Sequence, residues 1–393
     1  MTCVPPRGRS PVYTAIRTHG FTESVIREMT RVANEHGAIN LSQGFPNFPA
    51  PDVVKEGAIE AIRSDVNQYA ITWGAKRLRD AIAAKYARWY GMEVDPEREI
   101  VVTCGATEAV VAALLAIVDP GDEVIIFEPY YENYWPDTIL CSAEPVFVQM
   151  DLTGEIDLDR LAAAFSSRTR AIVVNSPNNP TGRVLRRSEL EGIAELCERH
   201  DAYAVTDEIY EHILYEGEHI PIATLDGMAE RTITVSGASK TFSITGWRIG
   251  TIVAPAGVTG AIRKVHDFLT VGAPAPLQEG LAAGMETLGQ DYYDRLTADY
   301  RARREVMVDG LLAAGFSCEP PGGAYYVMAD FSALSDLPDD EFSVWLTREI
   351  GVTPVPGSSF YRNPADGRNL VRFAFCKTGD LLLEAVERLA ALA

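Results

Sequence analysis

The sequence is poor in lysine and contains no paired metal-binding motif. Its six cysteines are far apart and form no Cys-x-x-Cys pair, and its six histidines are scattered, with no His-Glu-x-x-His. We therefore expect neither a zinc site nor a disulfide framework, but reduced thiols in a cytoplasmic protein. A lysine in an unusual setting is easy to notice, because the only lysines are Lys55, Lys76, Lys85, Lys240, Lys264 and Lys377.

Long hydrophobic runs are also missing. The longest fully apolar run spans residues 109–118, which is too short to cross a bilayer. The N-terminal Pro5, Pro6, Arg7 and Arg9 leave no room there for the apolar core of a signal peptide. A formal net charge of −20 argues against nucleic acid or an anionic membrane as the main partner. A small anionic substrate stays compatible with this charge, because a pocket can be basic inside an acidic protein.

What is present favours a large α/β domain. Short apolar segments predict strands at 100–103, 123–127, 145–148, 171–175, 202–206, 232–235 and 248–254. Helical patterns lie between several of them, at 108–118, 158–165 and 188–200. This alternation predicts a mainly parallel, seven-stranded sheet between helices. Such sheets bind ligands at the carboxyl ends of their strands.

The remaining segments predict a second, smaller α+β domain. A helical pattern runs through residues 273–313, strand-like segments follow at 323–328 and 370–375, and an N-terminal helix is expected at 24–35. We predict an N-terminal arm and part of the small domain at 1–45, a large domain at 46–285 and a C-terminal small domain at 286–393. A cleft between the domains is the natural place for a site.

Lys240 follows a predicted apolar strand, in the segment Ser236-Gly237-Ala238-Ser239-Lys240-Thr241. Small residues let the backbone approach a ligand closely, and a desolvated lysine has a lowered pKa and attacks aldehydes. Taken alone, the segment fits a solvated surface lysine slightly better. The phosphate-binding P-loop is excluded because Ser239, not glycine, precedes the lysine. The Ser-x-x-Lys pattern is excluded by Gly237.

Two further segments suit a phosphate. Arg248 begins a predicted strand close to Lys240, where it fits either an ordinary salt bridge or a guanidinium fork for phosphate. Gly105-Ala106-Thr107 lies between a predicted strand and a helix. The free amides and the dipole of a helix N-terminus attract anions, although many strand-to-helix turns look alike.

Polar residues also end two other predicted strands. Asp207 lies in Thr206-Asp207-Glu208-Ile209-Tyr210, where it suits either a helix N-cap or the partner of a protonated ring nitrogen. Tyr210 could then bond a phenolic oxygen on the same ring. Asn179, in Asn-Ser-Pro-Asn-Asn-Pro-Thr-Gly, either belongs to a rigid turn only or aims its amide into the cleft.

The order of these motifs resembles that of the class I aminotransferases, which are fold-type-I pyridoxal-phosphate enzymes. The motifs are Asn-Asn-Pro-Thr-Gly, Asp-Glu-Ile-Tyr, Ser-Lys-Thr-Phe-Ser-Ile-Thr-Gly-Trp-Arg-Ile-Gly and Val-Arg-Phe. The resemblance extends from residue 40 to residue 373. It is nearest to the kynurenine/glutamine transaminase K group and to the aspartate aminotransferase-like group. It implies a pyridoxal 5′-phosphate cofactor and an α/β fold with a smaller second domain.

The resemblance also implies roles for single residues. Lys240 would carry the cofactor as a Schiff base and shuttle the proton, and Asp207 would pair with the pyridine nitrogen. The other cofactor contacts that it implies are Tyr210 and Asn179 at the phenolate oxygen, Tyr131 stacked on the ring, and Arg248 with the amides of Ala106 and Thr107 at the phosphate.

Serine is common three residues before the lysine in this family, but Gly237 stands there, so either Ser236 or Ser239 is expected to supply the hydroxyl. Arg372 resembles the clamp on the substrate carboxylate, beside the Gly44 amide and Asn179. Tyr69 resembles a residue that reaches the phosphate of a neighbouring subunit, which implies a homodimer with shared sites.

The substrate expectation rests on two departures. The aspartate-specific branch carries a lysine at the position of Thr107, and its absence disfavours a strict dicarboxylate substrate. The aromatic and histidine pair of the kynurenine group aligns with Val271 and Gly272. We therefore expect transfer of the amino group of a neutral or hydrophobic L-amino acid, methionine among them, to a 2-oxo acid such as 2-oxoglutarate, in a ping-pong reaction.

Three alternatives stay open at this stage. They are an aspartate aminotransferase, a carbon–sulfur β-lyase acting on cysteine conjugates, and a pyridoxal-binding regulator. The regulator is the least favoured, because the chain has neither spare length nor a basic patch for a DNA-binding segment.

Overall fold

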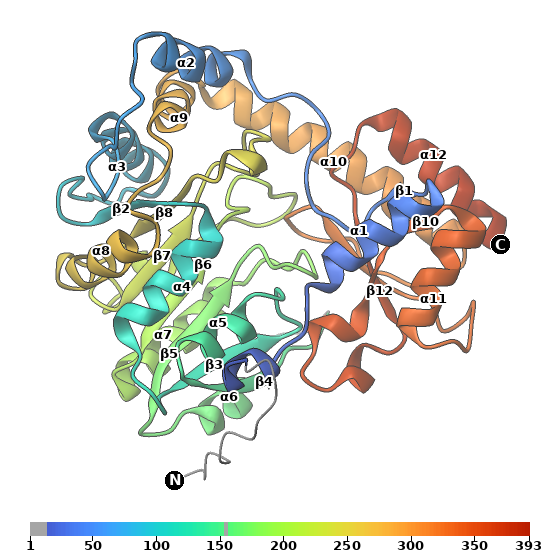
Figure 1. Ribbon diagram of the computed structural model, residues 1–393. Helices are drawn as coiled ribbons and strands as arrows, with labels where there is room; N and C mark the ends of the chain where they lie inside the picture. The colour runs from blue at the N-terminus through green and yellow to red at the C-terminus, as the bar shows by residue number, and fades with distance from the viewer. Residues whose placement is uncertain (1–13, 153–155) are drawn as a thin grey trace.

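The computed structural model describes residues 14–152 and 156–393, and its centre is a seven-stranded sheet (Figure 1). The strand order is β2-β8-β7-β6-β5-β3-β4, and every pairing is parallel except the two made by β8. The mainly parallel sheet predicted from the sequence is confirmed. Its strands are β2 (Ile100–Thr103), β3 (Glu123–Glu128), β4 (Glu144–Gln149), β5 (Thr169–Asn175), β6 (Tyr203–Asp207), β7 (Thr232–Ser236) and β8 (Gly250–Val253).

Both faces of this sheet are covered, which explains its apolar strands. On β3, Val124 and Ile126 pack into one core, and Ile125 and Phe127 into another. The first core includes side chains of α4 (Ala106–Ile117), α5 (Tyr134–Leu140) and α8 (Ala256–Thr270). The second includes side chains of α6 (Leu158–Ala164) and α7 (Arg187–His200). Two more helices, α2 (Asp52–Arg63) and α3 (Lys76–Tyr90), pack against α9 (Ala275–Thr287).

The C-terminal part forms a second, smaller α+β region. Strands β9 (Tyr326–Asp330), β12 (Leu370–Ala374) and β11 (Val355–Pro356) make an antiparallel sheet. Near it lie α10 (Gln290–Ala313), α11 (Asp339–Trp345) and α12 (Gly379–Leu389) (Figure 1). The N-terminal segment joins this region, because α1 (Val25–His36) leads into β1 (Ile39–Asn40), which pairs with β10 (Val352–Thr353). The first thirteen residues of the predicted arm lie outside the described residues.

Three sequence-based boundaries differ from the structure. Arg248, expected to begin a strand, instead follows a short 3-10 turn with a φ of +54°, and β8 begins at Gly250. The helical pattern over 273–313 is two helices, because Leu288 and Gly289 between α9 and α10 have extended backbone. The strand expected at 323–328 begins only at Tyr326, because Gly322 and Gly323 belong to a turn whose amides and carbonyls bond other segments. Within the described ranges, no helix is both long and apolar enough to cross a membrane.

Candidate active site

Lys240 lies in the turn after β7, next to the loop that contains Gly44. Its Nζ donates to the Gly44 carbonyl at 3.1 Å and lies 5.9 and 5.8 Å from the ring centres of Tyr210 and Tyr325. Burial lowers the pKa of Lys240 to about 8. The interpretation of Lys240 as a solvated surface lysine is therefore wrong, and its amine is suited to attack an aldehyde.

Asp207 is buried at the carboxyl end of β6. Its Oδ2 accepts from the Tyr134 hydroxyl at 2.7 Å, and its carbonyl accepts from Asn175 Nδ2 at 2.8 Å. Burial raises the pKa of this carboxyl, while the Tyr134 hydroxyl and the Ile209 amide act in the opposite direction. No helix begins after Asp207, so the N-cap interpretation is wrong. A desolvated carboxylate of this kind is suited to keep a ring nitrogen protonated.

Tyr134 and Asn175 were not singled out from the sequence. Asn175 lies three residues before the Asn-Asn-Pro-Thr-Gly turn, and its Oδ1 accepts the Asn179 amide at 2.7 Å. Its position at the end of β5 was a usable signal, because the carboxyl ends of neighbouring parallel strands meet. Tyr134 begins α5 and had no such signal.

Arg372 is a fully buried cation on β12. Its Nη1 donates to Asn179 Oδ1 at 2.7 Å and its Nη2 to the Ser42 carbonyl at 2.5 Å. The guanidinium lies 4.3 and 5.0 Å from the ring centres of Tyr326 and Phe360. No carboxylate among the described residues pairs with it, and its Nε has no partner there. A buried cation without a counter-ion is costly, so this position is suited to an anionic ligand.

Tyr326 fills the space between Gly44 and Tyr210. Its hydroxyl lies 2.9 Å from the Tyr210 hydroxyl, and a Cβ on Gly44 would fall within 1.9 Å of it. Gly44 is therefore required here, because any side chain would collide with the tyrosine. Tyr326 was also missed in the sequence.

Arg248 and the first turn of α4 form a separate cationic cradle. A Cβ on Gly105 would lie 2.4 Å from Arg248 Nη2, so the guanidinium rests on the glycine backbone. Ala106 and Thr107 begin α4 directly after it, and the first amides of a helix have no intrahelical acceptor. Guanidinium and free amides together suit a phosphate.

The hydroxyls of the two candidate phosphate ligands, Ser236 and Ser239, have different partners. The Ser236 hydroxyl donates to Glu211 Oε1 at 2.5 Å, inside a buried network, whereas the Ser239 hydroxyl lies 3.5 Å from the Ile249 carbonyl. Ser239 is thus the one that remains available beside Lys240.

The sequence profile of the class I and II aminotransferases matches residues 36–389. The chain belongs to this family. It is 40% identical to the probable N-succinyldiaminopimelate aminotransferase DapC of Mycobacterium tuberculosis, over 97% of this chain and 98% of the relative. It is 35% identical to human kynurenine–oxoglutarate transaminase 1, over 95% and 97% of the two chains. The structure of Escherichia coli YbdL, a methionine aminotransferase, matches with a TM-score of 0.92 and 36% identity, over 97% of this chain and 100% of that one.

The protein is therefore a pyridoxal-phosphate-dependent aminotransferase with the fold-type-I architecture. The cofactor supplies an aldehyde and an electron-withdrawing ring, through which an amino group passes from one acid to another. The described residues fit it: an amine of lowered pKa at Lys240, a buried carboxylate at Asp207, and the cradle of Arg248 on Gly105.

Two of the predicted cofactor contacts, Tyr131 and Tyr69, lie in different surroundings. Tyr131 is next to Tyr134, with ring centres 5.8 Å apart, on the side of the site that contains Asp207. Tyr69 is 85% exposed. Ile71, Phe268, Leu269 and Val271 are exposed as well, and the segments that carry them are joined by the contacts of Thr72 with Asp267 and His266.

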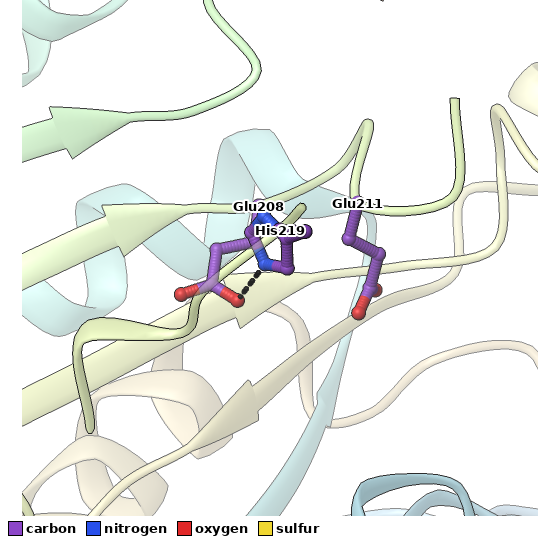
Figure 2. Close-up of side chains that lie close together, drawn as sticks. All are labelled: Glu208, Glu211 and His219. Atoms are coloured by element: carbon purple, nitrogen blue, oxygen red, sulfur yellow. Dashed lines mark hydrogen bonds and ion pairs between the residues drawn. The ribbon is translucent and has the colours of Figure 1, made fainter. Parts of the chain in front are cut away.

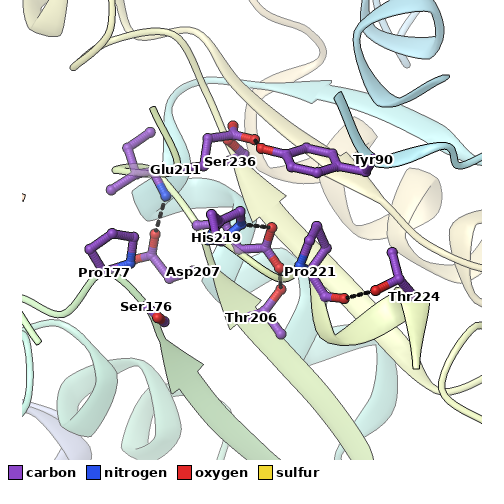
Figure 3. Close-up of polar contacts among 12 residues, drawn as sticks. Tyr90, Ser176, Pro177, Thr206, Asp207, Glu211, His219, Pro221, Thr224 and Ser236 are labelled. Atoms are coloured by element: carbon purple, nitrogen blue, oxygen red, sulfur yellow. Dashed lines mark hydrogen bonds and ion pairs between the residues drawn. The ribbon is translucent and has the colours of Figure 1, made fainter. Parts of the chain in front are cut away.

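A buried polar network lies behind Asp207. Glu208, Glu211 and His219 each offer one atom that could bind a metal, and these three atoms lie within 4.8 Å of one another. A ring nitrogen of His219 lies 2.8 Å from a Glu208 carboxylate oxygen (Figure 2). Glu211 also accepts from Tyr90 and Ser236 (Figure 3). It accepts from Lys85 as well. Burial, the largest single effect, would raise the pKa of Glu211, but Lys85, His212 and His219 together outweigh it and the pKa is lowered. Since Lys85 already neutralises Glu211, the cluster fits an ion-pair network that ties α3 to the ends of β6 and β7 better than a metal site.

A broad groove of about 1290 Å³ runs between α1, α5 and α11. Its lining includes Arg27, Trp135 and Trp345 but none of Lys240, Asp207 and Arg372. These three residues therefore do not line this groove.

Proposed function

We propose that the enzyme transfers the α-amino group of neutral or hydrophobic L-amino acids, methionine among them, to a 2-oxo acid such as 2-oxoglutarate by a ping-pong mechanism. One observation carries this proposal: two cations converge on one loop. Arg372 Nη2 bonds the Ser42 carbonyl, and Lys240 Nζ bonds the Gly44 carbonyl. An α-amino acid offers both a carboxylate and an amine within one small unit, and no carboxylate within residues 14–152 and 156–393 pairs with Arg372.

Within this proposal each residue acts at a stated group. Arg372 holds the substrate carboxylate in a bidentate fork, with the Gly44 amide and Asn179 beside it. Lys240 acts as the general base that accepts the α-proton of the amino acid and as the general acid that would give it back on the cofactor side. Cofactor contacts are assigned to Asp207 at the ring nitrogen, Tyr210 and Asn179 at the phenolate, Tyr131 on the ring face, and Arg248, Ser239, Ala106 and Thr107 at the phosphate.

The choice of side chain is supported by Thr107 and by the diversity of the relatives. Thr107 has no positive charge for a distal carboxylate, and a buried second carboxylate would need one. The relatives' names describe donors as different as methionine, kynurenine and N-succinyldiaminopimelate, which share only the α-amino acid unit. This favours a broad side-chain range over strict aspartate specificity.

We also propose a homodimer formed through the patch of Tyr69, Ile71, Phe268, Leu269 and Val271. The two halves of the patch are held together, because Thr72 Oγ1 bonds Asp267 at 3.2 Å and His266 bonds the Thr72 carbonyl at 2.9 Å. Phe268 is 91% exposed, and such contiguous apolar surface usually marks an interface. The five cysteines within the described ranges are free thiols, which supports a cytoplasmic location.

The test is a screen of half-reactions. Cofactor-loaded enzyme is mixed with single L-amino acids, and the absorbance band of the lysine-bound cofactor is followed as it converts to the amino form. Neutral and hydrophobic amino acids should bleach the band, aspartate should do so more slowly, and Lys240→Ala should be inactive. Release of pyruvate and ammonia without a 2-oxo acid would instead identify the β-lyase. If no amino acid bleaches the band, the proposed function is wrong.

A further inference from the structure

Lys377 is a second buried cation near the site, and no part of the proposed reaction uses it. The residue is 3% exposed and follows the strand β12 that carries Arg372. Among the residues that the structure describes, no carboxylate pairs with its ammonium. Lysine is rarely buried without a partner, so the position calls for an explanation.

The ammonium of Lys377 holds both sides of Gly44. Its Nζ donates to the Gln43 carbonyl at 3.2 Å and to the Phe45 carbonyl at 3.0 Å. It also lies 3.9 Å from the centre of the Phe45 ring, a cation–π contact that offsets part of the desolvation.

The three residues 43–45 form a tight turn. The Phe45 amide donates to the Gln43 carbonyl at 3.0 Å, which is the bond of a γ-turn. The Gly44 carbonyl accepts from Lys240 Nζ and from the Tyr325 hydroxyl, at 3.1 and 3.0 Å. Within the described part of the chain the Gly44 amide donates to no partner, so it is free for a ligand.

Neighbouring contacts attach the same loop to the end of β12. Ala374 donates its amide to the Leu41 carbonyl at 2.8 Å, and Thr378 donates its amide to Asn47 Oδ1 at 2.7 Å. The strand that carries Arg372 therefore also fixes the backbone of residues 41–47. Of the residues that make these contacts, only Lys377 bonds the carbonyls of both neighbours of Gly44, Gln43 and Phe45.

We infer that Lys377 is a positioning residue that orients the Gly44 amide toward the substrate carboxylate held by Arg372. The inference rests on the proposed function, since it assumes that a carboxylate binds there. Lys377 does not contact the substrate. It fixes the turn, and its charge polarises the Gln43–Gly44 peptide unit, which contains the Gly44 amide, and the Phe45–Pro46 unit.

The experiment compares carboxylate binding with cofactor binding in the loaded enzyme. The probes are 4-(methylsulfanyl)butanoate and 3-phenylpropanoate, which keep the carboxylate and side chain of methionine and phenylalanine but lack the amine. Their dissociation constants are measured from the change in cofactor absorbance. In Lys377→Met we expect the dissociation constants of both probes to rise about 10-fold, because a charge-assisted hydrogen bond that holds the turn is lost. The Kd for the cofactor should stay within about twofold, and KM for the amino acid should rise more than kcat falls.

Three further variants make the test decisive. Lys377→Gln keeps two N–H donors without the charge and should bind the probes with intermediate affinity. Phe45→Ala removes the ring beside the ammonium, at a residue 36% exposed, and carries the test together with Lys377→Gln if Lys377→Met does not fold. Lys76→Met, at a side chain 70% exposed, is the matched control and should leave all constants unchanged.

The two failures are distinguishable. If wild-type enzyme binds neither probe and reacts with no amino acid, the proposed function fails. If wild-type enzyme binds the probes and folded Lys377 variants bind them equally well, or lose cofactor and probe in parallel, only the positioning role fails.

Discussion

Gly105, between β2 and α4, supports the guanidinium of Arg248, which lies just before β8. A Cβ at Gly105 would come within 2.4 Å of Arg248 Nη2, and the glycine itself has a φ of +86°. The cofactor cradle therefore depends on the absence of a side chain at one position of the turn before α4.

Substituting Gly105→Ala should weaken cofactor binding. The new methyl group displaces Arg248, and an L-residue at positive φ costs about 1–2 kcal/mol. We expect the Kd for pyridoxal phosphate, measured by quenching of protein fluorescence, to rise at least about 10-fold. Gly91→Ala is the control, since Gly91 has a φ of +65° but nothing within 4 Å of an added Cβ. Equal cofactor affinities of the two variants would contradict the cradle.

Loading of the cofactor should follow the ionisation of Lys240. Only the neutral amine attacks the aldehyde, and burial lowers the pKa of Lys240 to about 8. The neutral fraction rises with pH, from about a tenth one unit below the pKa toward saturation one unit above it. The rate at which apoprotein gains the cofactor band should therefore rise between pH 7 and 9 and then level off. A rate that keeps rising toward pH 10 would contradict the lowered pKa. Repeating the profile with pyridoxal, which lacks phosphate, separates the lysine from ionisation of the phosphate.

Tyr134→Phe should shift the acid limb of the pH profile upward. The Tyr134 hydroxyl stabilises the ionised form of Asp207 by a bond of 2.7 Å, so its removal raises the pKa of that carboxyl further. Because a bond to a charged group contributes about 1.5–3 kcal/mol, we expect a shift of about one pH unit in kcat/KM and a roughly 10-fold loss at the acid end. Tyr130→Phe, a buried neighbouring tyrosine, is the control. An unchanged acid limb in Tyr134→Phe would show that the bond does not tune Asp207.

Phe268→Glu should dissociate the proposed dimer. A charge in the centre of an apolar interface costs several kcal/mol, so we expect monomers in sedimentation velocity at micromolar concentration. Activity should fall with it, because Tyr69 of the neighbouring subunit would no longer complete the site. Leu383→Glu changes a residue 50% exposed on α12, outside the patch, and should leave both mass and activity unchanged. A Phe268→Glu variant that stays dimeric would place the interface elsewhere.

The fold was largely readable from the sequence, because the local patterns agree with the tertiary environment. Short apolar segments separated by helices predict a buried parallel sheet, and all seven strands form. The pattern over 273–313 was less reliable, since helical periodicity continues on both sides of Leu288 and Gly289 and does not report the break between them.

The sequence by itself determined the family and the identity of the lysine, arginines and aspartate, because their chemistry and order are local properties of the chain. Only the tertiary structure decided which of these groups have partners. It turned Ser236 toward Glu211, gave Asp207 the Tyr134 hydroxyl, and brought Lys377 onto the loop of Gly44. It also left Arg372 without a carboxylate partner among the residues that the structure describes. Each of these contacts joins segments far apart in sequence. The pairing of a charge and the pKa of a buried group depend on such neighbours, which no local pattern specifies.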